Sequence, residues 1–195
     1  QLIATNNHVI PADMDTENLE RLVVLSGTGA TTRMHQAVFS GSSPEHDLAV
    51  IRVDTRIPAL KFTNTDQLLG EGENVAFTGF PIGAILGLYP VTHRGLISAI
   101  TPIATPSSSS SQLSATKISR LRDPLFVYQL DATAYPGNSG SPLYRPDTGE
   151  VVGILNMVFV KSTKEDVLSK PSGISYAIPV KYLRSLVQKL EVAKP

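Results

Sequence analysis

Short apolar segments separated by turn-forming residues recur along most of the chain. Gly and Pro number 14 each, and both types punctuate strands more often than they interrupt long helices. Segments of this length and spacing predict an all-β fold, either a barrel or a sandwich. The predicted strands cover residues 2–4, 22–25, 48–53, 75–78, 96–100, 126–130, 151–160 and 174–178.

Two regions depart from this rhythm. After Pro179, apolar residues recur at helical spacing behind a proline at a suitable first helical position, which predicts a short C-terminal helix over 179–195. Residues 101–124 contain five consecutive serines and three prolines, and we expect a long surface loop there. No internal repeat is visible.

Composition narrows the classes of function. Lys plus Arg and Asp plus Glu number 17 each, so the formal net charge is zero and no nucleic-acid partner is expected. The chain has no cysteine, which excludes disulfides and thiolate catalysis. The longest apolar run, residues 151–160, is too short to span a bilayer as a helix, and no signal segment opens the sequence.

The segment TAYPGNSGSPLY, residues 133–144, surrounds Ser139 with small residues. One interpretation is an ordinary turn. The other is a backbone that exposes its N–H groups to a substrate carbonyl while Ser139 attacks it. The second needs a base to accept the hydroxyl proton, and histidine suits that role near neutral pH.

Four histidines precede Ser139. His8 is the strongest candidate base, because in LIATNNHVI an apolar strand runs into two asparagines that form turns readily. His35 and His93 have no acidic or histidine partner at metal-ligand spacing, so no metal site is predicted. The Gly-x-Gly pairs at 27–29 and 70–72 lack a phosphate-binding pattern, so no nucleotide or other cofactor is expected.

Asp47, in HDLAVIRV, is the candidate carboxylate that orients the histidine. In a strand, residues 47, 49, 51 and 53 would face one side of the sheet and residues 48, 50 and 52 the other, which would give Asp47 a defined side and turn His46 the opposite way. Taken alone, Asp47 also fits an acidic residue that closes a loop before a strand.

Seven motifs span nearly the whole chain: TNNHVI, HDLAVIRVD, TGFPIG, GLISAI, QLDATAYPGNSGSPLY, GEVVGILN and SYAIPVKYL. With these motifs, the chain resembles the trypsin-like serine proteases, especially the bacterial HtrA branch. The resemblance implies a single domain of two perpendicular six-stranded antiparallel β-barrels, one over about residues 1–70 and one over about 71–178, before the C-terminal helix. We expect the first barrel to lack its N-terminal strands and no PDZ domain to follow.

The resemblance also implies site roles. His8 would be general base and then general acid, Asp47 its orienting carboxylate and Ser139 the nucleophile, with the N–H groups of Gly137 and Ser139 forming the oxyanion hole. The substrate pocket would include residues without negative charge, which favours a small or medium apolar side chain before the scissile bond. These residues are Thr133, Ala134, Leu155, Asn156, Met157 and Ile174.

These roles predict a serine endopeptidase acting on protein or peptide substrates. By the same resemblance we expect an extracytoplasmic location and an influence of the 101–124 loop on access to the site. The alternative function is a catalytically silent trypsin-like binding or scaffold module.

Overall fold

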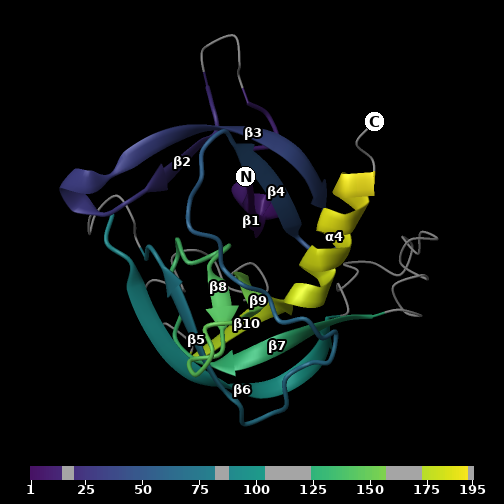
Figure 1. Cartoon of the computed structure of the whole chain (residues 1–195). Helices are drawn as coiled ribbons and strands as arrows, with labels where there is room; N and C mark the ends of the chain where they lie inside the picture. Colours follow the sequence, from purple (N-terminus) through teal and green to yellow (C-terminus); the bar gives the residue numbers. More distant parts are fainter. Residues whose placement is uncertain (15–19, 82–87, 104–123, 157–172, 193–195) are drawn as a thin grey trace.

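The computed structural model describes residues 1–14, 20–81, 88–103, 124–156 and 173–192. These residues form two β-structures and one α-helix (Figure 1). The first is an open four-stranded sheet in the order β1-β4-β3-β2, and the second is a closed six-stranded barrel in the order β10-β7-β6-β5-β8-β9. The all-β prediction is confirmed, and the first unit has four strands among the described residues.

The first sheet is formed by β1 (Leu2–Asn6), β2 (Val23–Ser26), β3 (Arg33–Ser43) and β4 (Leu48–Val53), with short 3-10 turns η1 (Asn7–Val9) and η2 (Gly29–Thr31). All pairs are antiparallel, and Asn6 lies opposite Leu48 in the β1–β4 pair. Five of the six β4 residues are buried, as the continuous apolar letters LAVI predict for a strand covered on both faces.

The barrel is formed by β5 (Asn74–Gly79), β6 (Val91–Ile103), β7 (Leu125–Asp131), β8 (Pro142–Tyr144), β9 (Val151–Asn156) and β10 (Ile174–Pro179). Its interior is an apolar cluster that includes Phe77, Leu130, Leu143 and Leu155, all completely buried. Closure leaves no free edge in this unit.

Helix α4 (Val180–Val192) follows β10 directly and packs where the two units meet. Its buried residues Val180, Leu183 and Leu186 share one apolar cluster with Leu48 of β4 and with β9 and β10. The helix lies beside both units in Figure 1. The C-terminal periodicity therefore predicted the helix, and its apolar face joins the open sheet to the barrel.

Residues 61–65, between the two units, are hydrogen-bonded to β9 and to α4. The Val151 N–H of β9 donates to the Lys61 carbonyl, and the Thr63 N–H donates to the Val151 carbonyl. The Arg184 guanidinium of α4 donates to the carbonyls of Thr63 and Thr65, each at 2.7 Å. Residues 61–65 are thereby held against both β9 and α4.

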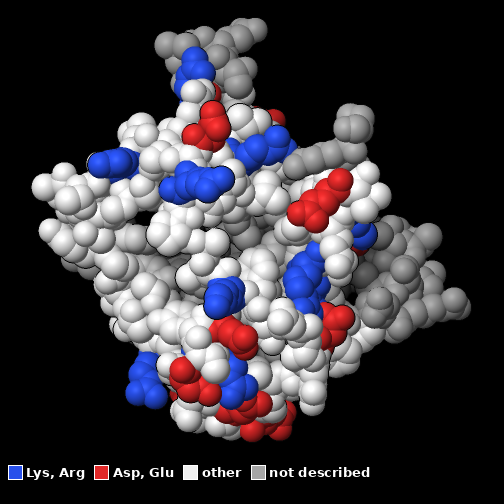
Figure 2. Space-filling view, viewed as in Figure 1, with Lys and Arg blue, Asp and Glu red and all other residues white. Residues whose placement is uncertain are grey.

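On the surface, cationic and anionic side chains are interspersed. The face in Figure 2 has Lys and Arg side chains standing among Asp and Glu side chains. This distribution agrees with the zero formal net charge of the sequence.

The shared apolar cluster predicts a stability effect at Leu183, which is completely buried. Leu183→Ala leaves a cavity between the units, and we expect it to lower the free energy of unfolding by about 2–5 kcal/mol. Urea unfolding followed by circular dichroism measures the change. Val192→Ala is the control on the same helix, because Val192 is 86% exposed. Equal small shifts in both variants would contradict the role assigned to the cluster.

Candidate active site

His8 lies in the 3-10 turn that follows β1. Two asparagines attach this turn to the loop before β4: the Asn6 side-chain amide donates to the Asp47 carbonyl at 3.1 Å, and the Asn7 backbone N–H donates to it at 3.0 Å. The Asn6 side chain is completely buried. The register of β1 on β4 therefore brings the His8 turn next to Asp47.

The Asp47 carboxylate accepts three hydrogen bonds. The His8 backbone N–H donates to Oδ1 at 2.8 Å, and His8 Nδ1 lies 2.6 Å from Oδ2. The Asn156 side-chain amide of β9 donates to the same Oδ2 at 2.6 Å. Because an ionised carboxylate only accepts, Nδ1 carries the proton and Nε2 is the nitrogen that can act as a base.

These contacts determine the ionisation of Asp47. Burial raises the pKa of its carboxyl, but the hydrogen bonds from the His8 ring, the His8 backbone and Asn156, and the charge of the His8 ring, outweigh burial. The net pKa lies below the ordinary aspartate value. The site thus favours a carboxylate that stays charged beside His8.

The backbone of Asp47 is not extended. The predicted strand over residues 48–53 is confirmed, because β4 begins at Leu48, but Asp47 ends a turn with φ 51° and does not have the defined side of the sheet that a place in the strand would give it. Asp47 is the single non-glycine residue with positive φ among those described, and this conformation is unfavourable for most side chains. The correction follows from the bonds of Asn6 and Asn7 to its carbonyl, which hold the residue out of the extended conformation.

Ser139 is a central residue of the second of two consecutive turns, residues 135–138 and 138–141. The Asn138 N–H donates to the Tyr135 carbonyl, and the Ser141 N–H donates to the Asn138 carbonyl. Pro136 and Gly137 occupy the centre of the first turn, and Gly137 has φ 98°. Proline followed by a residue of positive φ is the signature of a type II turn. Compared with type I, this turn flips the central peptide and hence the direction of the Gly137 N–H.

Contacts of Gly140 attach the Ser139 segment to the elements that hold His8 and Asp47. The Gly140 N–H donates to the carbonyl of Leu155, the residue before Asn156 on β9. A Cβ at Gly140 would lie 2.6 Å from Thr5 Oγ1 on β1, and φ is 87° there, so this position requires glycine. The adjacent β9 residues Leu155 and Asn156 thus contact the serine turn and the Asp47 carboxylate, respectively.

The predicted pocket residues come partly together. The Ala132 N–H donates to the Gly173 carbonyl at 3.0 Å, and Asn156 lies opposite Tyr176 in the β9–β10 pair. Ala134 and Leu155 belong to the buried barrel core, Thr133 is half-buried and Ile174 is 46% exposed. Met157 and most of the 101–124 loop lie outside the described residues. Asn156 directs its amide at Asp47.

The sequence did not predict three hydrogen bonds to Asp47. Asn6 and Asn7 were singled out only as turn-forming residues before His8, and Asn156 only as a substrate contact, yet all three donate to Asp47. The paired asparagines before His8 were a usable signal. Nothing local in GILN links Asn156 to a residue in another unit.

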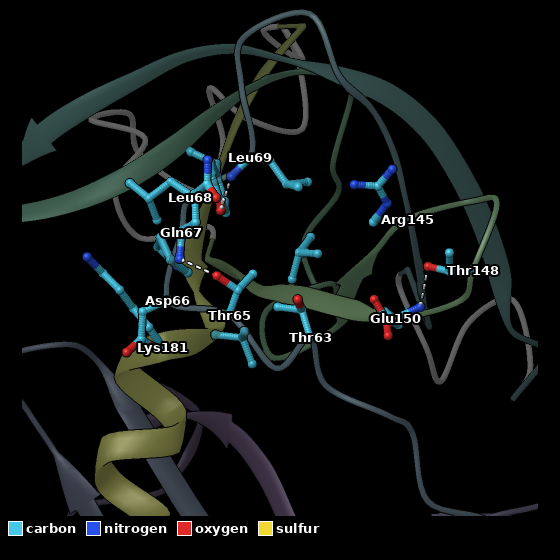
Figure 3. A pocket seen from close by; sticks show the side chains of 14 residues that line it. Thr63, Thr65, Asp66, Gln67, Leu68, Leu69, Arg145, Thr148, Glu150 and Lys181 are labelled. Atoms are coloured by element: carbon cyan, nitrogen blue, oxygen red, sulfur yellow. Dashed lines mark hydrogen bonds between the residues drawn. The ribbon is translucent and has the colours of Figure 1, made fainter.

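A separate pocket of about 180 Å³ lies between the 63–69 segment, the barrel and the start of α4 (Figure 3). Its rim carries charges of both signs, Asp66, Arg145, Glu150 and Lys181. It contains none of His8, Asp47 and Ser139. We place the candidate chemistry at the hydrogen-bonded His8–Asp47 pair, since this pocket has no nucleophile and base within hydrogen-bond reach.

The lowered pKa predicts a pH dependence of stability. The contribution of Asp47 is complete above the ordinary aspartate value of about 3.9 and disappears as pH falls through the lower pKa of the folded protein. We therefore expect Asp47→Asn to be less stable than the wild type near neutral pH and the difference to shrink below about pH 4. Urea unfolding across pH measures it. Asp54→Asn, at an exposed aspartate just after β4, is the control, and indistinguishable pH profiles for the two variants would contradict the assignment.

Among the described residues, no group of His, Asp and Glu is arranged to hold a metal ion. The one described α-helix, α4, is too short to cross a membrane.

The chain is similar to proteins named as serine proteases. The chain is 29% identical over 189 residues to "Serine protease Do-like HtrA" of Bacillus subtilis (strain 168), covering 96% of the chain and 36% of that protein. It is 32% identical over 191 residues to "Probable periplasmic serine endoprotease DegP-like" of Marinomonas sp. (strain MWYL1), covering 97% of the chain and 33% of that protein. The chain therefore spans about a third of the length of these relatives.

The chain is also similar to solved structures of proteases. The "HtrA-type protease AlgW with decapeptide" superposes with a TM-score of 0.67 at 25% identity, covering 98% of the chain and 49% of that structure. The serine endoprotease from Yersinia pestis superposes with a TM-score of 0.64 at 26% identity, covering 97% and 53%. The trypsin-like peptidase domain profile matches residues 1–154, and the chain belongs to this family.

Proposed function

We propose that the protein is a serine endopeptidase that cleaves peptide bonds through an acyl-enzyme formed on Ser139. The observation that carries the proposal is the 2.6 Å contact between His8 Nδ1 and Asp47 Oδ2, which fixes the tautomer and leaves Nε2 as the base. Membership of the trypsin-like peptidase family supports the same reaction.

In the first half of the reaction, His8 Nε2 takes the Ser139 proton while Oγ attacks the scissile carbonyl carbon. The C=O π pair moves onto the oxygen, and a tetrahedral intermediate forms. The charged Asp47 carboxylate stabilises the imidazolium. When the intermediate collapses, the C–N bond breaks, the leaving amine takes the proton from Nε2, and an ester to Ser139 remains. Water repeats the sequence, with His8 first as base and then as acid, and releases the carboxylic acid.

The oxyanion is stabilised by the N–H groups of Gly137 and Ser139. Among the described residues, the Gly137 N–H has no hydrogen-bond partner, so it can donate to a substrate oxygen. The neighbouring Asn138 N–H is already used to close the turn on Tyr135. The type II conformation at Gly137 supports an oxyanion hole formed before substrate binds.

We further propose a small or medium apolar side chain before the scissile bond, in a pocket built from Thr133, Ala134, Ile174 and the 155–157 segment. Relatives named as periplasmic support an extracytoplasmic location, and a structural relative described with a decapeptide supports peptide substrates.

A fluorophosphonate probe tests the reaction at Ser139. We expect the wild type to be labelled, Ser139→Ala to remain unlabelled and His8→Ala to label far more slowly. Peptide turnover should fall on the order of 10⁶-fold in Ser139→Ala. A folded wild type that is neither labelled nor active on peptides contradicts the proposal.

A peptide library read by mass spectrometry tests the pocket. Because a Lys or Arg side chain would be buried there without a counter-charge, we expect Ala or Val before the cleaved bond to be preferred over Lys or Arg by about tenfold or more. Digestion with Ser139→Ala is the control for contaminating proteases. Predominant cleavage after Lys or Arg would refute the pocket assignment without touching the Ser139 mechanism.

A further inference from the structure

Both sequence neighbours of Asp47 are linked to helix α4, one through a shared apolar cluster and one through a stacked ring pair. Leu48 is completely buried and shares an apolar cluster with Val180, Leu183 and Leu186. On the other side, the His46 imidazole stacks on the Tyr182 ring, with centroids 4.6 Å apart and planes inclined by 26°. Asp47, with its φ of 51°, thus lies between Leu48, which shares an apolar cluster with α4, and His46, which stacks on Tyr182 of α4.

The stacked rings are themselves fixed. His46 Nδ1 lies 2.7 Å from Ser43 Oγ and 3.3 Å from Glu45 Oε1, so polar groups of its own turn hold the edge of the ring. Tyr182, in the first turn of α4, accepts a hydrogen bond from the Phe126 N–H of β7 through its hydroxyl, at 3.2 Å. The stack therefore joins the Asp47 turn of the first sheet to the wall of the barrel.

This connection affects the candidate site because Asp47 is hydrogen-bonded to both the first sheet and the barrel. Its carboxylate accepts from His8 of the first sheet and from Asn156 of the barrel. Its φ of 51° is unfavourable and persists only where the surroundings hold it. If the turn relaxed toward an ordinary conformation, the carboxylate would swing away from the His8 ring.

We propose that His46 and Tyr182 are positioning residues, whose stack holds the Asp47 turn against α4 and keeps the carboxylate on His8. The inference rests on the proposed function, since Asp47 affects a rate only if His8 acts as the base. Neither residue touches the reacting atoms, so their effect should fall on the chemical step.

Kinetics of variants that remove or keep the stack test the inference. His46→Ala and Tyr182→Leu should lower kcat about tenfold and leave KM within about twofold, because small displacements of a catalytic group are costly. His46→Phe and Tyr182→Phe keep two facing rings and should retain kcat within about twofold. Gln188→Ala, at an exposed position of α4, is the matched control. Combining His46→Ala with Tyr182→Leu should add little to either alone, since both break one contact.

A second readout is independent of peptide cleavage. In the Ser139→Ala background, the His8 Nδ1–H in its short bond to Asp47 should give a far-downfield proton resonance. We expect this resonance to broaden or move upfield with His46→Ala or Tyr182→Leu and to stay in place with Gln188→Ala. His46→Gln, which loses the aromatic face but keeps a polar edge, replaces a variant that does not fold.

The outcomes separate the two proposals. Folded stack-breaking variants with unchanged kcat and an unchanged His8 resonance overturn the inference. A wild type that shows the resonance but has no activity and no probe labelling overturns the proposed function instead, and the response of the resonance to Tyr182→Leu then still decides whether the stack positions Asp47.

Discussion

A charged carboxylate in a half-buried position has to be compensated by donors, and the donors of Asp47 come from both halves of the molecule. His8 reaches it from the end of β1, and Asn156 reaches it from β9 of the barrel. Without them, burial would shift Asp47 toward its neutral form, which cannot stabilise an imidazolium. The open sheet and the barrel must therefore adopt one relative position for the pair to be charged and oriented.

Several contacts hold the open sheet and the barrel in that relative position. Residues of α4 fill the apolar contact between the units, and residues 61–65 are bonded to both β9 and the helix. Gly140 allows the serine turn to approach Thr5, three residues before His8. Apart from the hydrogen bonds of the Arg184 guanidinium, these contacts are apolar, backbone or steric, so the open sheet and the barrel are aligned mainly by packing. The ionic chemistry is built on a geometry that packing already fixes.

The sequence predicted elements whose pattern is local. The β4 strand, the barrel strands with apolar cores and the α4 helix follow from periodicity alone. It missed β3, Arg33–Ser43, because most of that strand is exposed or half-buried and its letters RMHQAVFSGSS do not alternate cleanly. Its extended form comes from pairing with β2 and β4 on either side. The three-residue β8 was missed because it is short and begins with proline.

Asp47 shows the same limit at the site. The strand over residues 48–53 was predicted, but the turn conformation of Asp47 just before it was not, because the hydrogen bonds that hold this turn come from Asn6 and Asn7, some forty positions earlier. The choice of His8 and Asp47 as partners was still possible, since each lies at the end of a recognisable strand and the β1–β4 register joins those ends. The residues around Asn156 in the sequence did not predict its role, because its hydrogen bond to Asp47 joins the barrel to the first sheet. The chemistry is therefore predictable where one sheet register brings the residues together, and it ceases to be predictable where residues of the open sheet and of the barrel must meet.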